Sequence, residues 1–360
     1  MKIAIGLSGG VDSSLSAHLL QEQGHELVGV FLECWRAPGC RAEEDRKDAL
    51  QVALDLGIPF QVLDFKDAYR GRVVDRFVAD YRRGLTPNPD IWCNTEIKFG
   101  LFYDWAMAEG FDAVATGHYA RVESDTSGER NLLRGVDEKK DQTYFLYRTQ
   151  QEQLEHILFP IGHLRKEEVR PLAAARKIHV ADKPDSQGIC FIGDINVHNF
   201  LKDELGEKPG DVLDTDGNII GSHLGHWFYT IGQRHGFELL PKVRTKKEEW
   251  KHVLPPLYVI SKEAGSNIIT VGYGVETTRA EVQLEDLFWR RPDLMIPDGG
   301  AVKARVRHGG ALLPATVRVT PLQGVSLQFE QAQRGLAAGQ SVVLYGGEND
   351  ELCLGGGVIG

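Results

Sequence analysis

A glycine- and serine-rich loop joins the first predicted strand of the chain to the first predicted helix. Residues 3–7 are apolar and predict a buried strand, and residues 13–23 show the apolar spacing of a helix that stops at Gly24. The loop between them, GLSGGVDSS from Gly6 to Ser14, consists mostly of small residues. Backbone N–H groups of such a loop converge on an anion, and the start of the helix adds a favourable dipole. The chain is therefore expected to fold around a strand–loop–helix unit that binds phosphate.

This loop differs from two common nucleotide motifs. It lacks the lysine of the GxxxxGK[ST] pattern, so transfer of a γ-phosphoryl group is not indicated. It also lacks GxGxxG, which argues against a dinucleotide site. The alternative is a plain glycine turn in which serine or aspartate caps the helix.

Strands and helices alternate over the first 120 residues. This order predicts an α/β fold whose mostly parallel sheet carries helices on both faces. Residues 142–177 are also expected to be helical. The predicted strands are 3–7, 26–32, 60–65 and 113–116, and the predicted helices are 13–23, 43–56, 68–83 and 97–108.

Short strands replace this alternation from about residue 207 onward. Asp216-Gly217 between two apolar pairs predicts a hairpin, and the regular spacing of the later runs predicts small barrels. We place domain boundaries near 205 and 280. The expected domains are an α/β catalytic domain at 1–205, a small β-rich domain at 206–280 and a β-barrel that contacts RNA at 281–360. The later strands are predicted at 257–260, 268–271, 280–282, 301–306, 316–319, 325–329 and 341–344.

The composition excludes several broad classes of protein. Of the 360 residues, 42% are hydrophobic and 26% are charged, as in soluble globular proteins. No apolar run approaches the ~20 residues that span a bilayer and no secretory signal opens the chain, so a cytoplasmic protein without membrane contact is expected. The net charge of −10 does not by itself favour binding to nucleic acid. Five cysteines in such a chain indicate reduced thiols rather than a disulfide framework.

Two of the cysteines lie in polar loops that contain proline or glycine. Cys93 follows TPNPDIW and is expected just before a helix, where the helix dipole and Lys98 would favour the thiolate. Cys190 lies in DSQGICFIG, where a glycine two residues earlier permits close approach of a substrate. No metal-ligand spacing is present. The other three cysteines are expected to be structural or incidental, and they are Cys34, Cys40 and Cys353.

The order of these motifs resembles that of a known enzyme family. SGGVDSS is similar to the loop of the ATP pyrophosphatases, which cleave ATP between the α- and β-phosphates and leave an adenylated substrate. The other motifs narrow the resemblance to the bacterial and organellar tRNA 2-thiouridylases, the MnmA family, over nearly the whole chain. These motifs are TPNPDIWCN with EIKFG, ATGHYAR at 115–121, KKDQTYFL at 139–146, KPDSQGICFIGD at 183–194, GHWFYTIGQRHG at 225–236 and, near the end, GQSVVLY with CLGGG.

The resemblance implies that the loop binds ATP together with Mg²⁺. Asp12 would lie near the Mg²⁺ and the pyrophosphate, and the adenine would lie near Leu32 and Gly117. No metal site made by the protein alone is expected. The positions that match the family's phosphate loop are Gly6, Leu7, Ser8, Gly9, Gly10, Val11, Asp12 and Ser13.

The resemblance also implies sulfur transfer to the wobble uridine of tRNA. Adenylation would turn the C2 oxygen of uracil into a good leaving group, and a persulfide on Cys190 would then attack C2. Cys93 would act on that persulfide, free its sulfur and form a disulfide with Cys190, or it would assist in freeing sulfide. Asp90 would be the acid or base beside the uracil, the alternative being a simple turn residue after Pro89. The sulfur would come from a persulfide donor such as a cysteine desulfurase or a sulfur-relay protein.

The implied RNA partners are tRNAs with a wobble uridine, those that accept lysine, glutamate and glutamine. The unpaired base would enter a pocket lined by Asn88, Pro89 and Asp90. Val306 stands where the family commonly has an aromatic residue, which leaves a stacking role of this position open. The other tRNA contacts implied by the family are His118, Lys140, Asp141, Gln142, Arg305, Val306 and Gln340.

Local basic segments offset the acidic total. Residues 66–83 hold six Lys or Arg against three Asp or Glu. Lys303, Arg305 and Arg307 alternate on a predicted strand, so they are expected to share one face, either against RNA phosphates or simply in solvent. The segment 241–252 has five basic and two acidic residues and is expected to be a loop, to which we assign no role.

Two other functions fit part of the sequence. An ammonia-using ATP pyrophosphatase would share the loop but needs neither loop cysteine, and Lys2 stands where an amidotransferase nucleophile would lie. A nucleotide-binding sensor on an α/β fold would leave Cys93, Cys190 and the β-rich half without a role. Release of pyrophosphate from ATP that requires tRNA would distinguish these possibilities.

Overall fold

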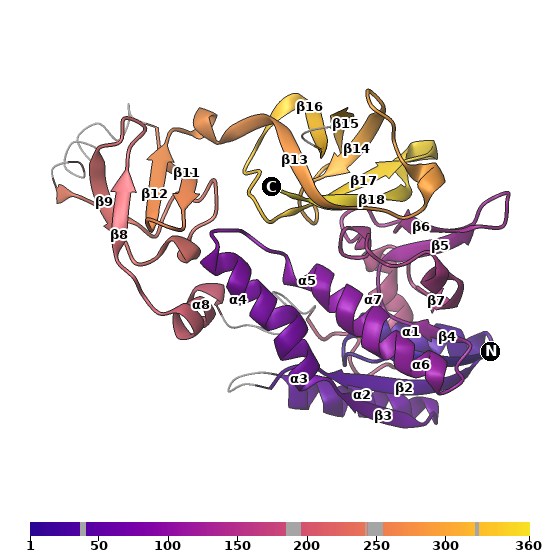
Figure 1. Ribbon diagram of the computed structural model, residues 1–360. Helices are drawn as coiled ribbons and strands as arrows, with labels where there is room; N and C mark the ends of the chain where they lie inside the picture. The colour runs from indigo at the N-terminus through magenta and orange to yellow at the C-terminus, as the bar shows by residue number, and fades with distance from the viewer. Residues whose placement is uncertain (37–40, 185–195, 242, 244–254, 321–323) are drawn as a thin grey trace.

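The computed structural model describes residues 1–36, 41–184, 196–241, 243, 255–320 and 324–360. A parallel sheet flanked by helices forms the N-terminal part, and two β-rich units follow it (Figure 1). This arrangement confirms the predicted fold class. None of the helices in the described ranges combines the length and the apolar character needed to cross a bilayer.

Five parallel strands form the N-terminal sheet in the order β3-β2-β1-β4-β7. The chain adds β2 and β3 on one side of β1 and then returns to place β4 and β7 on the other side. The connections after β1 and β4 therefore diverge at the carboxyl edge of the sheet, where α/β proteins bind their ligands. The strands are β1 Lys2–Gly6, β2 Glu26–Glu33, β3 Phe60–Asp64, β4 Ala113–Ala115 and β7 Ile157–Leu158.

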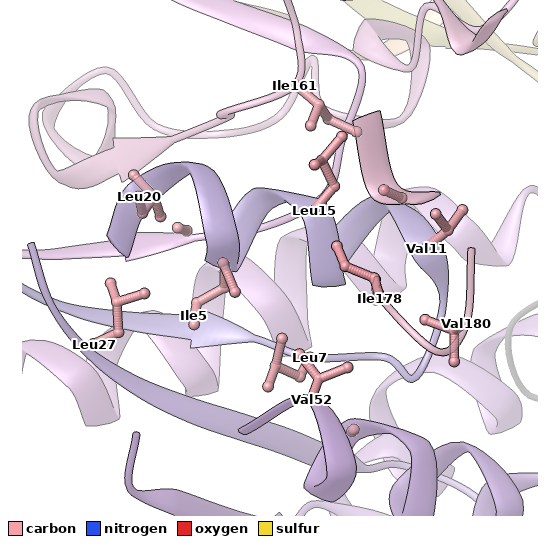
Figure 2. Close-up of a cluster of buried hydrophobic side chains, with 14 of the residues drawn as sticks. Ile5, Leu7, Val11, Leu15, Leu20, Leu27, Val52, Ile161, Ile178 and Val180 are labelled. Atoms are coloured by element: carbon pink, nitrogen blue, oxygen red, sulfur yellow. The ribbon is translucent and has the colours of Figure 1, made fainter. Parts of the chain in front are cut away.

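A hydrophobic core surrounds the first helix, α1. Ile5 of β1 and Leu27 of β2 belong to the same buried cluster as Leu15 of α1. Figure 2 shows this cluster, with Ile161 next to Leu15. Burial of these side chains is what holds the helix start, and with it the phosphate loop, against the sheet. The helices that accompany the sheet are α1 Val11–Glu22, α2 Ala42–Leu56, α3 Lys66–Tyr69, α4 Asp75–Arg82, α7 Lys166–Ala175 and α8 Val197–Leu205, with a π-helix at Arg70–Val74 between α3 and α4.

A continuous helical segment runs over residues 89–108. It starts earlier than the predicted helix at 97–108, because Asn88 accepts the backbone N–H of Asp90 at 3.1 Å and Pro89 suits the first turn. Its middle part is a π-helix, a form that is frequent at functional sites. The three parts are α5 Pro89–Trp92, the π-helix Cys93–Phe102 and α6 Tyr103–Ala108.

One of the two β-rich units is an open sheet, and the other is a closed barrel. The central unit is an open sheet of order β10-β9-β8-β12-β11, and the predicted hairpin turn at Asp216-Gly217 joins β8 to β9, with a φ of +83° at Gly217. In the C-terminal unit β13 pairs with both β16 and β18, so six strands close into a barrel. The strands of the central unit are β8 Gly210–Leu213, β9 Ile219–His223, β10 Glu238–Leu239, β11 Tyr258–Glu263 and β12 Ile268–Gly272. Those of the barrel are β13 Thr278–Trp289, β14 Ala301–Arg305, β15 Leu313–Thr320, β16 Gly324–Arg334, β17 Ser341–Gly346 and β18 Leu352–Ile359.

A hairpin from the N-terminal part extends the barrel sheet, and the sequence analysis did not predict it. It consists of β5 Ala120–Ser124 and β6 Arg130–Arg134. β6 pairs with β18 at Leu133 and Leu352. Leu132 of this hairpin is fully buried in a core that also contains Val343 of the barrel. The N-terminal and C-terminal parts therefore share one hydrophobic core.

The prediction of continuous helix over 142–177 was wrong. This stretch holds two 3-10 helices, Thr143–Phe145 and Glu152–His156, then β7, and only afterwards α7. Tyr144 and Tyr147 are both buried because the stretch packs between the sheet and the barrel, so apolar residues at helical spacing here reflect burial from several sides.

Replacing Leu132 by alanine tests the shared core. Loss of this fully buried side chain is expected to lower the free energy of unfolding by ~2–5 kcal/mol, since a cavity remains between hairpin and barrel. Urea unfolding followed by circular dichroism measures the change. Ile219→Ala, at an exposed position, is the control and is expected to change the stability by about 0.5 kcal/mol or less. Equal effects of the two substitutions would contradict the shared core.

Candidate active site

The predicted phosphate loop lies at the carboxyl edge of the sheet between β1 and α1. Gly9 has a φ of +74°, a backbone conformation that glycine adopts without strain. Gly117, which follows β4, comes so close that a Cβ atom there would lie 2.6 Å from the backbone nitrogen of Ser13. The loops after β1 and β4 therefore touch, as the strand order of the sheet requires.

Hydrogen bonds within the loop hold its serines. Ser8 donates its backbone N–H to Ser13 Oγ at 3.2 Å, and Ser14 Oγ donates to the carbonyl of Gly10 at 2.8 Å. The N-cap of α1 is Gly10, and no side chain caps the helix. The alternative in which serine or aspartate caps this helix is therefore wrong. The N–H groups of the first turn, which have no partner inside a helix, remain for an anion.

Asp12 in the first turn of α1 contacts two residues that the sequence analysis did not single out. Its carboxylate accepts hydrogen bonds from Lys166 Nζ at 2.7 and 2.9 Å and from the Tyr119 hydroxyl at 2.8 Å. Lys166 is the first residue of α7, and no spacing rule links it to a loop 154 positions earlier. A distant helix thus places a lysine ammonium group beside the loop.

Lys183 brings a second ammonium group to the loop. Its Nζ donates to the carbonyl of Gly9 at 2.9 Å and to Asp45 Oδ1 at 2.7 Å, and it also pairs with Asp48 of α2. Burial alone would lower the pKa of Lys183, but the bonds to the two carboxylates outweigh burial and raise it. The segment that leads towards Cys190 is therefore anchored to the phosphate loop by a charged lysine.

The two residues predicted beside the adenine lie at the same edge of the sheet. Leu32 is half-buried near the end of β2, where its register partner on β3 is Leu63. Gly117 is half-buried just after β4. Since β2 and β4 are the two neighbours of β1, these residues stand on either side of the phosphate loop.

Cys93 lies inside the helical segment rather than before it. Because the segment starts at Pro89, one turn precedes Cys93, and the predicted place of this cysteine at the helix start was wrong. Its side chain is buried in a cluster with Trp92 and Ile97. Lys98 directs its ammonium group to His118, with 3.3 Å between Lys98 Nζ and His118 Nε2.

The three residues predicted to line a base pocket lie at the start of this helical segment. Pro89 is buried, while Asn88 and Asp90 are half-buried. Asn94 donates its side-chain N–H to the carbonyl of Asp90 at 2.9 Å, and its own buried Oδ1 has no hydrogen-bond partner in the described part of the chain. Asn88 is also hydrogen-bonded to Tyr144. This bond connects the start of the helical segment to the 3-10 helix Thr143–Phe145.

His118, one of the predicted tRNA contacts, is buried between the rings of Phe99 and Phe159. Its Nδ1 lies 2.7 Å from Thr116 Oγ1. Burial, reinforced by the charge of Lys98, holds the pKa of His118 well below its usual value, so the imidazole is neutral at pH 7. The helical segment that carries Cys93 thus meets the loop after β4 through the Lys98–His118 contact.

Two further predicted tRNA contacts form a buried ion pair with each other. Arg305 Nη1 lies 2.5 Å from Asp141 Oδ2, and the two residues are only 2% and 1% exposed. Asp141 also accepts from Arg134 Nε at 3.3 Å and from the Thr143 hydroxyl at 2.8 Å. The prediction of an exposed basic face with Lys303, Arg305 and Arg307 was wrong, because β14 ends at Arg305, whose guanidinium turns inward to this carboxylate.

The remaining predicted tRNA contacts are more accessible. Lys140 is half-buried, and Gln142 accepts the backbone N–H of Tyr119 at 2.9 Å. Val306 and Gln340 line a cavity of about 320 Å³ between the central unit and the barrel, together with Arg307.

Most of the basic residues of segment 66–83 are paired with acids. The ion pairs are Lys66 with Asp64 and Glu33, Arg70 with Glu204 and Asp75, Arg72 with Glu96, and Arg83 with Asp80. Arg76 instead places its guanidinium 3.3 Å from the ring centroid of Trp92. The local surplus of charge is therefore less available to RNA than the sequence suggested.

The other cysteines differ in setting. Cys353 is fully buried, and burial raises the pKa of its thiol to about 12, as suits a structural residue. Cys34 is half-buried beside the cluster that contains Cys93. Cys40 and Cys190 lie outside the described residues, as does the basic segment 241–252 apart from Pro241 and Val243.

Comparison with known proteins decides the family. Residues 1–194 match the tRNA methyl transferase HUP domain, 198–273 the tRNA methyl transferase PRC-barrel domain and 279–359 the aminomethyltransferase beta-barrel domain. The tRNA-specific 2-thiouridylase MnmA of Pediococcus pentosaceus is 40% identical over 99% of this chain and 94% of its own length. The enzyme of the same name from Streptococcus agalactiae is 41% identical over 100% and 95%. The chain belongs to the MnmA family of tRNA-specific 2-thiouridylases.

Membership of the MnmA family makes this chain a sulfurtransferase. Among solved structures, the U34-tRNA thiolase NcsA from Methanococcus maripaludis, described with its [4Fe-4S] cluster, is 19% identical and has a TM-score of 0.37. The match covers 57% of this chain and 66% of the NcsA chain. This likeness is too weak to inform on function. The match to the MnmA relatives includes the β-rich half, for which an ammonia-using synthetase or a sensor offers no role.

Removal of Arg305 tests its structural place in this MnmA-family protein. Arg305→Ala is expected to lower the free energy of unfolding by ~3–5 kcal/mol, because Asp141 keeps a buried charge that has lost a partner. Arg307→Ala, two residues further on and exposed, is the matched control and is expected to cost about 0.5 kcal/mol or less. Thermal and urea unfolding measure both. Equal stability of the two variants would contradict the buried ion pair and would favour the exposed position of Arg305 that the sequence predicted.

Proposed function

We propose that this chain uses ATP to convert the wobble uridine of tRNA to 2-thiouridine. The observation that carries the proposal is the contact between the phosphate loop and the helical segment of Cys93. Gly117 packs on Ser13, and the next residue, His118, meets Lys98 of that segment. A nucleotide on the loop and a base held near Asp90 would then share one side of the molecule.

Activation of the uracil is the first step. The C2 oxygen attacks the α-phosphorus of ATP, the bond to the bridging oxygen breaks, and pyrophosphate leaves. The proton on N3 of the base passes to a carboxylate, for which Asp90 is the candidate. The N–H groups of the first turn of α1, together with Lys166 and Lys183, would stabilise the charge that develops on the phosphates.

The residues at the loop fit an Mg²⁺ ion that arrives with ATP. Mg²⁺ is usually held by one or two carboxylates and by substrate phosphates. Asp12 is partly exposed and now neutralised by Lys166, so it would bind the ion once Lys166 turns to a phosphate. The ion would supply charge stabilisation to the departing pyrophosphate.

Sulfur transfer is the second step. The outer sulfur of a Cys190 persulfide attacks C2, and AMP leaves. The Cys93 thiolate then attacks the Cys190 sulfur, and the S–S bond breaks so that its electron pair stays on the sulfur bound to C2. The proton held by the carboxylate returns to the base, so the products are 2-thiouridine and a Cys93–Cys190 disulfide, which an external thiol reductant returns to two thiols. The persulfide itself requires a donor protein.

The polar surroundings of Asp90 support a pocket for the base. The buried Oδ1 atom of Asn94 lacks a partner among the described residues, and buried acceptors are normally satisfied. An N–H group of a bound base would satisfy an acceptor of this kind. The expected substrates are tRNAs for lysine, glutamate and glutamine, whose wobble uridine would enter unpaired.

Replacing Asp12 by asparagine tests the phosphate site. We expect tRNA-dependent release of pyrophosphate to fall by about 10²–10³-fold, because a charged group that faces the nucleotide is lost. Glu43→Gln removes a carboxylate from the first turn of α2 and is the matched control, expected to retain full activity. Near-normal pyrophosphate release by folded Asp12→Asn would remove this residue from the mechanism.

Loading with radiolabelled sulfur tests the roles of the two cysteines and thus the proposed function. A persulfide donor, ATP and substrate tRNA are supplied, and label on protein is separated from label on tRNA. Cys190→Ser is expected to take up no label yet still release pyrophosphate, whereas Cys93→Ser is expected to keep one labelled sulfur and not complete thiolation. Cys353→Ser should behave as wild type, since its thiol is buried and inert.

Three results would revise this scheme. Wild-type protein that transfers no sulfur to any of these tRNAs would refute the function. Label retained by Cys190→Ser at the wild-type level would move the persulfide to another cysteine, with Cys93 the first to examine. Full thiolation by Cys93→Ser would reduce the reaction to a single thiol.

A further inference from the structure

An aromatic pair joins the barrel to the N-terminal part beside the predicted base pocket. His308 follows β14, and its ring centroid lies 4.5 Å from that of Phe145 with 36° between the planes. Phe145 ends the 3-10 helix Thr143–Phe145, and Tyr144 packs edge-on against it at 5.4 Å. His308 is exposed and Phe145 is half-buried, so the pair has one face in solvent.

His308 lies near the predicted base pocket, because its partner Phe145 belongs to the 3-10 helix Thr143–Phe145, which contacts α5. The charges that act on the imidazole come from Arg305, Asp141, Asp90 and Lys140. Asp90 is the candidate acid or base, and Lys140 is a predicted tRNA contact. Tyr144, the neighbour of Phe145, is hydrogen-bonded to Asn88 of the same pocket. The pair therefore stands beside the segment that is expected to receive the uracil.

Val306, the first residue after β14, supplies no aromatic surface. Its side chain packs against the core of the barrel instead. Two residues later the chain presents an imidazole, which already lies against a phenyl ring. We infer that His308 and Phe145 form a platform on which an unpaired base of the tRNA anticodon loop stacks. This inference rests on the proposed function and names a part of its RNA site.

The physical state of the imidazole suits stacking. Although one side of the residue is exposed, partial desolvation of the ring by neighbouring atoms, together with the charge of Arg305, lowers the pKa of His308, and the carboxylates of Asp141 and Asp90 only partly oppose this. The imidazole of His308 is therefore neutral at pH 7. Because it lies against the ring of Phe145, the two rings together form one uncharged aromatic surface that reaches solvent. Single-stranded RNA is commonly held by bases that stack on such side chains, independently of hydrogen-bond readout.

Binding of an anticodon stem–loop RNA tests the platform. The probe carries 2-aminopurine next to the wobble uridine, so that stacking on an aromatic side chain quenches its fluorescence. Variants of the full chain are His308→Ala, His308→Tyr and Phe145→Leu. His156→Ala is the matched control, because His156 also packs on an aromatic ring, that of Tyr103, but lies beside Asp112 at the opposite edge of the sheet.

The expected result separates a stacking role from a structural one. His308→Ala should weaken RNA binding by about 5- to 150-fold, the range that the loss of one base–aromatic stack implies, and should lose the quenching. His308→Tyr should restore both, while Phe145→Leu should lose the quenching and His156→Ala should change neither. The affinity for ATP in the absence of RNA should stay the same in every variant.

Two outcomes would overturn the platform. Wild-type affinity and quenching in His308→Ala would show that no base stacks there. Equal losses in His308→Tyr and His308→Ala would show that the imidazole acts through its nitrogens and not through its face. Failure of the proposed function would look different, because the wild-type protein itself would then neither bind the probe nor thiolate tRNA.

Discussion

A single buried carboxylate holds the junction on which the arrangement of this protein depends. Asp141 accepts hydrogen bonds from Arg134 of the hairpin, from Thr143 of the following turn and from Arg305 of the barrel. A buried charge is tolerated only when its partners are all in place, so the three segments must meet in one geometry. The turn after Asp141 carries Tyr144, which contacts Asn88, and Phe145, which contacts His308. The segment that we propose binds the base is therefore positioned by an ion pair that does not itself face solvent.

The parts of the fold that the sequence predicted are those with local signals. β1, the loop and α1 follow from apolar spacing and small residues, and the hairpin turn at Asp216-Gly217 follows from its dipeptide. The stretch 142–177 was wrongly predicted to be helical, because side chains that are buried on several sides can have the same spacing as the apolar face of an amphipathic helix. The hairpin β5–β6 was missed since its strands alternate weakly and take their partner from the far end of the chain.

The site shows the same division between local and distant signals. The loop residues and Cys93 stand in motifs, so their positions could be read, although Asn88 and Pro89 start the helix earlier than apolar spacing alone indicated. Lys166 lies in no motif, and Lys183 begins the motif at 183–194 without any local signal that links it to the phosphate loop. Only the fold brings the two ammonium groups to that loop. Arg305 appeared to be an exposed strand residue because alternation along a strand cannot tell which face meets another domain.

The pairing of β6 with β18 has a consequence for how the chain acquires its structure during synthesis. About 220 residues separate these strands, and at ribosomal rates of roughly 5–20 residues per second the partner of β6 emerges some 10–40 s after β6 itself. Until then the hairpin has an open edge, and the carboxylate of Asp141 has only part of its final set of donors. The N-terminal part therefore cannot reach its final form while it is still the only part made. A nascent chain of this kind has to keep an unpaired strand and an incomplete charge cluster away from other chains until its last strand arrives.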